Sequence, residues 1–165
     1  MDDDQVLLLL EDSLKQLVAQ DIYLLERNLH ERTITHKLAE ILQPLFPEWN
    51  VDCEYNRDGH DSKRVKIDSD PIPDAQLDAG SNVFPDIIIH HRGNNEYNLL
   101  IIEAKKRHNF NGCIDDYDRK KIEAFKADLH YRCGAAITFF VGEVEGERIE
   151  IFFYSGGNWR DPIYI

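Results

Sequence analysis

Apolar residues near the N-terminus recur at steps of three and four, which is the spacing of one face of a helix. The first run of this kind consists of Val6, Leu9, Leu10, Leu14, Leu17 and Val18. It predicts a helix over about residues 1–20. A second helical pattern starts after Asp21, a suitable cap residue, and continues to about Leu42, where Pro44 and Pro47 predict its end.

Later in the chain, shorter patterns predict strands. Apolar and polar residues alternate over Val51–Arg57, which predicts a first strand. Val83–His90 and Leu99–Lys105 are apolar and rich in β-branched residues, and the turn-rich residues 92–95 between them predict a hairpin. The helical period then returns over about residues 116–130.

Two more apolar runs, over residues 135–141 and 148–154, predict a final pair of strands. Residues 58–82 are charged and contain Pro and Gly, so we expect a long mobile loop there, holding at most a short strand near 65–67. The expected order is α-α-β-β-β-α-β-β in a single α/β domain over residues 1–165.

The composition is that of an unexported protein with one core. The chain has 165 residues, of which 42% are hydrophobic. It has no apolar run of about eighteen residues, and its apolar stretch 6–10 follows three aspartates where a signal peptide would need positive charge. Three widely spaced cysteines predict neither a disulfide framework nor a zinc knuckle. We therefore expect a cytoplasmic protein without a membrane partner.

The net charge of −12 argues against tight non-specific binding of nucleic acid, because that affinity comes from lysines and arginines that neutralise phosphates. The charge is unevenly distributed, however, and basic clusters occur at 63–66, 105–107 and 119–121. A local basic face is compatible with this distribution. The alternative is that these clusters are ordinary solvated surface runs.

Asp86 and Glu103 are the first candidates for chemistry. If the hairpin turns at Asn94-Asn95, Asp86 lies directly opposite Glu103 on one face, with the Cβ atoms about 5 Å apart. Two carboxylates at that separation repel each other unless a cation or a proton lies between them. Oxygen ligands of this kind favour Mg²⁺ or Mn²⁺ over zinc.

Lys105 shares the face of Glu103 two residues further on, where its ammonium would orient an attacking water and offset charge on a phosphate. These groups suit the hydrolysis of a phosphodiester. The pattern Asp/Glu-x-Lys occurs three times, but only Glu103-Ala104-Lys105 ends an apolar strand that is preceded by a strand headed by Pro85-Asp86. The alternative is a strand end with a surface ion pair between Glu103 and Lys105.

The second predicted helix adds a carboxylate. Glu31 lies on or at the edge of the apolar stripe that should face the sheet, and an unpaired carboxylate there is costly, so we expect it to point at the metal site. Alternatively, Glu31 pairs with Lys37 or Arg27 at the margin of the stripe. Glu26 competes for the same role.

These residues resemble the motifs of the PD-(D/E)XK superfamily of restriction-endonuclease-like nucleases. The resemblance covers Glu31-Arg32-Thr33, Cys53–Arg57, Pro85–His90 and Ile102–Lys106, in that order. It implies a restriction-endonuclease-like core, with a central mixed β-sheet of about five strands flanked by helices. It also implies a magnesium site formed by Glu31, Asp86, Glu103 and the backbone carbonyl of Ala104, with Lys105 as the catalytic lysine.

The same resemblance implies a DNA endonuclease more than an RNA endonuclease, and suggests, by analogy, a role in host defence or with mobile elements. Nucleic-acid contacts would fall on Asn56, Arg57, Lys106 and Lys121, although Lys121 could equally be a solvated position. A chain of this size would obtain specificity as a homodimer or from a partner protein. Two alternatives stay open: an acidic protein that mimics nucleic acid, and an inactive nuclease-like subunit of a larger complex.

Overall fold

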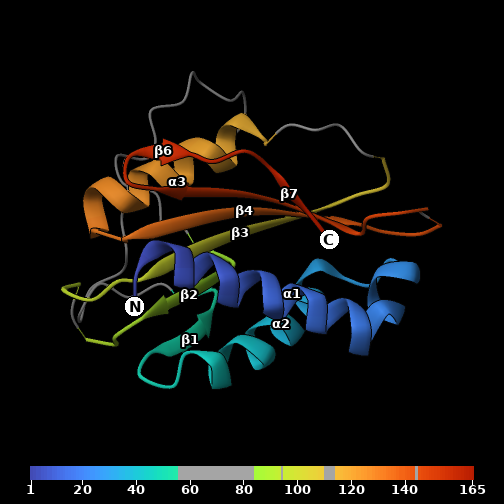
Figure 1. Ribbon diagram of the computed structural model, residues 1–165, viewed down its shortest axis with the longest axis horizontal. Helices are drawn as coiled ribbons and strands as arrows, with labels where there is room; N and C mark the ends of the chain where they lie inside the picture. The colour runs from blue at the N-terminus through green and yellow to red at the C-terminus, as the bar shows by residue number, and fades with distance from the viewer. Residues whose placement is uncertain (56–83, 94, 110–113, 144) are drawn as a thin grey trace.

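The computed structural model describes residues 1–55, 84–93, 95–109, 114–143 and 145–165. Its helices are α1 (Asp3–Glu26), α2 (Glu31–Leu45) and α3 (Asp116–Leu129). Its strands are β1 (Asn50–Cys53), β2 (Ile87–His90), β3 (Leu100–Arg107), β4 (Cys133–Phe140), β5 (Ile149–Ser155), β6 (Asn158–Trp159) and β7 (Ile163–Tyr164). The molecule is therefore an α/β protein, as predicted (Figure 1).

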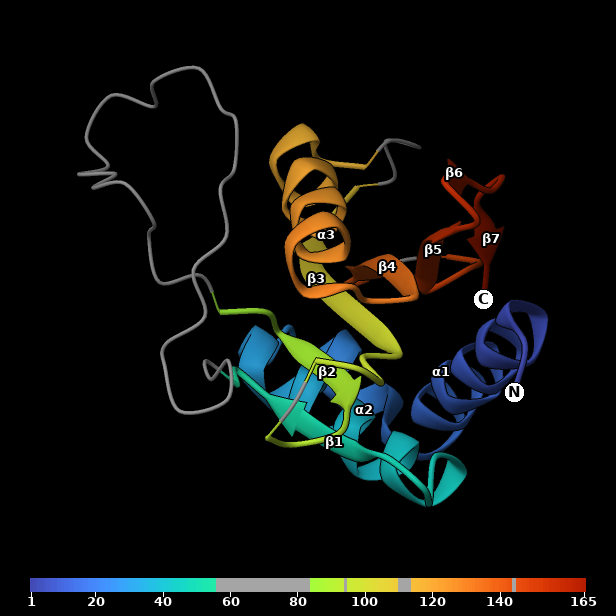
Figure 2. The same cartoon turned by 90° about the vertical axis from the view of Figure 1, so that its left-hand side faces the viewer.

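The described strands form one open, mixed sheet of seven strands in the order β1-β2-β3-β4-β5-β6, with β7 also paired to β5. The β3–β4 pair is parallel, and every other described pair is antiparallel. In Figure 2, β1 and β7 lie near opposite ends of the sheet. The prediction of about five strands missed β6 and β7, because a strand of two residues is too short to show a period.

The helical backbone is interrupted at Asp21, where the boundary between the first two helices was predicted, but the second helix does not continue unbroken from there to Leu42. Asp21 has a non-helical backbone, but the helix continues beyond this kink to Glu26. The chain turns instead at Asn28, whose φ is 52°, and α2 begins at Glu31 after the side chain of His30 caps the amide of Arg32. The apolar spacing could not reveal the turn at Asn28, because Ile22, Leu25 and Leu29 continue the helical steps of three and four across it.

The strands agree more closely with the predictions, except at their ends. The first strand ends at Cys53 instead of Arg57, and Glu54 follows it with a φ of 48°, a left-handed conformation that does not continue a strand. The expected loop over 58–82, its short strand near 65–67, and Asn56 and Arg57 all lie outside the described residues.

Helices α1 and α2 cover one face of the sheet, and α3 covers the other (Figure 1). The core under α1 and α2 is the larger and contains alternate residues of β3, namely Leu100, Ile102 and Ala104. Ile101 points the other way and packs against Ile122 and Phe125 of α3. By alternation, Glu103 and Lys105 also lie on the α3 face.

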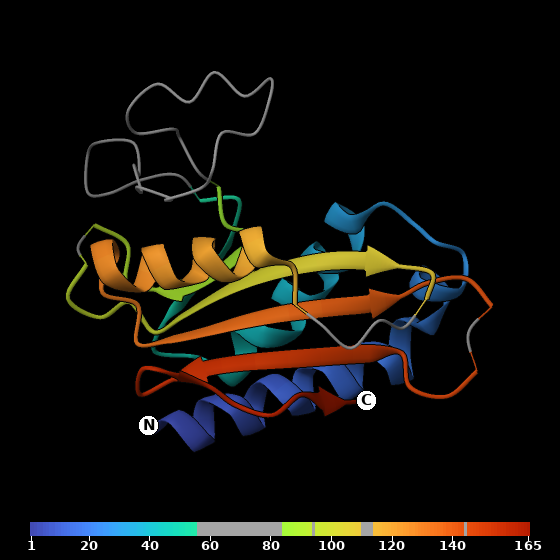
Figure 3. The same ribbon diagram turned by 90° about the horizontal axis from the view of Figure 1, so that it is seen from above.

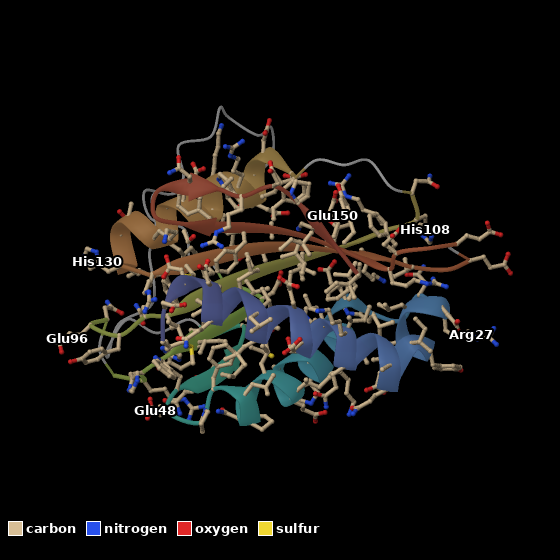
Figure 4. The ribbon with its side chains drawn as sticks, viewed as in Figure 1. Arg27, Glu48, Glu96, His108, His130 and Glu150 are labelled. Carbon is tan, nitrogen blue, oxygen red and sulfur yellow. The ribbon has the colours of Figure 1, made fainter. Side chains whose placement is uncertain are left out.

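Helix α3 connects the two parallel strands and runs back along them, as Figure 3 shows. His108, just after β3, and His130, just after α3, accordingly lie at opposite ends of the sheet (Figure 4). The helix approaches β4 closely at Gly134, where an added Cβ would lie 2.2 Å from Cγ2 of Ile122. A glycine is therefore needed for α3 to pack at this depth.

The described helices include none that combines the length and the apolar character needed to cross a membrane.

Candidate metal centre

The register of the hairpin agrees with the sequence prediction. Ile87 pairs with Ile102, Ile88 with Ile101 and Ile89 with Leu100. The next pair in this register would be Asp86 and Glu103, but the ladder of β2 and β3 ends one step earlier. Asp86 therefore lies at the point where β2 begins, beside the part of β3 that β2 does not cover.

Two carboxylates bind the backbone of β3 along this uncovered edge. Oδ2 of Asp86 accepts a hydrogen bond of 2.7 Å from the amide of Ala104. Oε2 of Glu31, the first residue of α2, accepts one of 3.1 Å from the amide of Lys106. Amide and carbonyl of a strand residue point to the same side, so the carbonyl of Ala104 faces this edge as well.

Glu103 lies behind this edge, on the face covered by α3, and is only 2% exposed. Its Oε2 is 2.7 Å from Nζ of Lys121, whereas its Oε1 is buried and has no hydrogen-bond partner among the described residues. Burial, together with the charges of Asp86 and Asp118 and against the attraction of Lys121, raises the pKa of Glu103 to about 8. A buried carboxylate oxygen that lacks a donor is an open ligand for a cation.

Lys105 follows on the same face, and its side chain is about half exposed (46%). Its Nζ is 3.6 Å from Oδ1 of Asp118, which is buried on the inner side of α3. Burial alone would lower the pKa of Lys105, but the neighbouring carboxylates outweigh it and raise this pKa. The carboxylates responsible are Asp118, Glu31, Asp86 and Glu103, in that order. The ammonium is therefore firmly charged and faces all four.

The charges of this cluster do not balance. The carboxylates of Glu31, Asp86, Glu103 and Asp118 lie near the ammonium groups of Lys105 and Lys121, which leaves two negative charges when every group is ionised. Lys106, which acts on Glu31, and Asp115, which acts on Asp118, add one charge of each sign and leave this balance unchanged. Burial and the charge of Asp86 raise the pKa of Glu31, and burial and the charge of Asp115 raise the pKa of Asp118. One divalent cation would neutralise the excess.

In the described part of the chain, no three His, Cys, Asp or Glu side chains already lie close enough together to hold a metal ion. The carboxylates of the cluster are held apart because each one accepts a hydrogen bond from a different donor. Asp86 and Glu31 bind two different amides of β3, and Glu103 binds Lys121. The carboxylates are thus gathered around one segment of β3, but their oxygens do not meet at one point.

The predicted site residues can now be placed. Asp86, Glu103, Lys105 and Glu31 come together, and the amide of Ala104 binds one of them. Of the two alternative partners of Glu31, Lys37 instead pairs with Glu40, and the guanidinium of Arg27 lies over the ring of Tyr23. Glu26 is exposed at the end of α1, with no described contact to the cluster.

Two lysines predicted to bind nucleic acid are engaged within the protein. Nζ of Lys106 donates to Oδ1 of Asn28 and to the carbonyl of Leu29, so it fastens the turn between α1 and α2 to β3. Lys121 is only 8% exposed, so the reading of this residue as a solvated position is wrong. Phosphate binding by either lysine stays a prediction.

Asp118 was not predicted as a site residue. Its position on α3 offered a signal, because Asp118, Ile122, Phe125 and Leu129 recur at helical steps, which places a carboxylate on the inward stripe. This is the same argument that singled out Glu31.

A scan against protein-family models found no match, and searches of curated proteins and of solved structures found none either. The interpretation of this site therefore rests on the residues and geometry of the chain itself.

Proposed function

We propose that this protein is a metal-dependent nuclease of the PD-(D/E)XK type, with a restriction-endonuclease-like core, that hydrolyses phosphodiester bonds with Mg²⁺ or Mn²⁺. One observation carries the proposal: Glu31 of α2, Asp86 just before β2, and Glu103 and Lys105 of β3 gather around a single segment of β3. An ordinary surface ion pair at a strand end would not bring three further carboxylates to this lysine.

The residues of the cluster fit a divalent cation. Glu103 has a buried oxygen that finds no donor in the described residues, and the cluster carries an excess of negative charge when its groups are ionised. Asp86, Glu103, Glu31 and the carbonyl of Ala104 are the groups that would hold the ion, and all are the oxygen ligands that Mg²⁺ and Mn²⁺ prefer. When bound, the ion would supply a Lewis acid at the phosphate and a more acidic water.

Lys105 has a separate role in the proposed reaction. Its ammonium is half exposed, so an incoming phosphate can reach it, and the surrounding carboxylates keep it protonated. A charged ammonium at this place orients the attacking water and offsets the negative charge that develops on the phosphate. We therefore expect Lys105 to contribute to catalysis more than to the binding of substrate.

The substrate is proposed to be nucleic acid, with DNA favoured over RNA. Because the net charge is −12, affinity for phosphates would have to come from local contacts, for which Lys105 and Lys106 and the undescribed Asn56 and Arg57 are the proposed residues. A homodimer or a partner protein would add the contacts that the single chain lacks.

An acidic mimic of nucleic acid would instead spread its carboxylates over the surface at phosphate-like spacing. Here Glu103 and Asp118 are buried and turned toward lysines, which favours the nuclease.

The test is to incubate the protein with supercoiled plasmid, labelled single-stranded DNA and labelled RNA, each with Mg²⁺, with Mn²⁺ and with chelator. We expect cleavage that requires the metal. Asp86→Ala and Lys105→Ala should each abolish it, because one removes a ligand and the other removes the charge at the phosphate. Asp12→Ala, an exposed aspartate on α1, is the matched control and should cleave like the wild type.

Cleavage that persists in chelator, or in both site variants, would contradict the proposed mechanism. Absence of cleavage with every substrate and both metals would favour the acidic mimic or the inactive subunit.

A further inference from the structure

Lys121 is a buried lysine on α3 whose one ammonium contacts two separate parts of the proposed site. Nζ donates to Oε2 of Glu103 at 2.7 Å and to the carbonyl of Phe84 at 2.8 Å. Phe84 lies two residues before Asp86. The ammonium therefore joins the segment that leads into Asp86 to the side chain of Glu103.

This arrangement matters because pairing between β2 and β3 has already ended at this point. The last ladder pair is Ile87 and Ile102, so backbone pairing of these two strands does not fix the separation between Asp86 and Glu103. Two contacts bridge the gap: the amide of Ala104 with Asp86, and Lys121 with both Phe84 and Glu103. A side chain from α3 thus does what the ladder does elsewhere in the sheet.

Lys121 also determines which oxygen of Glu103 is open. It occupies Oε2, and the buried Oε1 is the oxygen for which the described part of the chain provides no donor. Without the lysine, the carboxyl group could rotate, or could bind another donor.

We propose that Lys121 is a positioning residue for the metal ligands: it fixes the orientation of Glu103 and its spacing from Asp86, and does not bind the phosphates of the substrate. The inference rests on the proposed function and deepens it. The burial of Lys121 supports this role, since an ammonium that is already held by a carboxylate and a carbonyl under α3 is poorly placed to reach a polyanion outside.

The test measures metal binding without any substrate. Isothermal titration calorimetry with Mn²⁺ would compare the wild type with Lys121→Met, which keeps the length of the side chain and removes its charge and donors. We expect the Kd for Mn²⁺ to rise by about ten- to a hundredfold, the usual loss when a residue that orients a ligand is removed. Lys120→Met, at the neighbouring exposed position of the same helix, is the matched control and should bind like the wild type.

Kinetics separate the positioning role from a phosphate contact. On the nucleic acid that the wild type cleaves, Lys121→Met should lower kcat and leave KM, and the dependence of KM on salt, unchanged. If Lys121 bound a phosphate, its loss would instead raise KM and reduce the slope of log KM against log salt concentration by about one.

Lys121→Gln provides a second variant if Lys121→Met does not fold, which a thermal melt followed by circular dichroism would reveal. Its amide keeps hydrogen-bond donors near Phe84 and Glu103 at a shorter reach and without a charge, so we expect metal affinity between those of the wild type and Lys121→Met. Wild-type Kd values in the folded variants would overturn the inference and leave the proposed function intact. A wild type that binds neither Mn²⁺ nor Mg²⁺ would instead contradict the proposed function itself.

Discussion

The two faces of the sheet bury different kinds of side chain. Under α1 and α2 the core is apolar, and the buried polar residues described there include Ser13 and Thr35, whose hydroxyl groups bond to carbonyls of their own helices. Under α3 the apolar cluster is smaller, and Glu103, Asp118 and Lys121 are buried beside it. These statements concern the described residues.

The difference separates the face that stabilises the fold from the face that carries the candidate site. Apolar burial stabilises roughly in proportion to area, so the face of α1 and α2 provides most of the stability. Buried ionisable groups cost desolvation energy that their partners only partly return, so the α3 face lowers stability in order to hold a crowded cluster of carboxyl and ammonium groups. Such a cost is typical of a functional site.

The largest expected effect is on the apolar face. Leu14→Ala removes a fully buried side chain of α1 and should lower the free energy of unfolding by about 3 to 4 kcal/mol, because it leaves a cavity. Leu8→Ala, on the same helix but 55% exposed, is the matched control and should change it by less than about 0.5 kcal/mol. Urea denaturation measures both. Equal losses in the two variants would mean that α1 does not pack as described.

A smaller effect, dependent on pH, is expected on the α3 face. Folding raises the pKa of Glu103 from 4.5 to about 8, so the protonated form favours the folded state. The contribution of this group is fully present below about pH 4.5 and is lost as the pH rises to about 8. In chelator, the wild type should therefore lose on the order of 3 kcal/mol relative to Glu103→Gln between pH 5 and pH 8.

The measurement for Glu103 is urea denaturation of both proteins across this pH range, in which titration elsewhere in the protein cancels. A stability difference that does not change with pH would contradict the buried, charge-crowded position of Glu103. Saturating Mg²⁺ should reduce the pH dependence, because a bound cation favours the ionised carboxylate.

The smallest expected effect is the loss of stability when the N-cap residue of α1 or of α3 is removed. The side chain of Asp115 caps α3 by accepting from the amide of Tyr117, and that of Asp2 caps α1 by accepting from the amide of Gln5. Replacing either by Ala should cost about 1 kcal/mol in unfolding experiments. Only Asp115→Ala should also weaken Mn²⁺ binding, because α3 carries Lys121 into the site. Equal metal affinity in the two variants would argue that the first turn of α3 does not support the site.

Much of the site could be predicted from local pattern. The apolar runs that form β2 and β3, and the turn-rich residues between them, were enough to predict their register. Glu31 stood out because a carboxylate interrupts an apolar stripe. Asp118 carries the same signal, because it continues the apolar stripe of Ile122, Phe125 and Leu129 on α3. The turn at Asn28 and the two-residue strands β6 and β7 could not be predicted, because each is too short to show a periodic pattern.

The sequence by itself determined the order of helices and strands up to β5, and the separation of apolar from polar faces, because both follow from periodicities of a few residues. Tertiary structure alone decided which donors hold each carboxylate: the amides of β3 for Asp86 and Glu31, and Lys121 for Glu103. These contacts join residues far apart in the chain, at a place where the ladder of two strands ends. The local spacing of apolar residues does not indicate where the pairing of β2 and β3 ends. The end of that pairing leaves the edge of β3 free to bind the carboxylates.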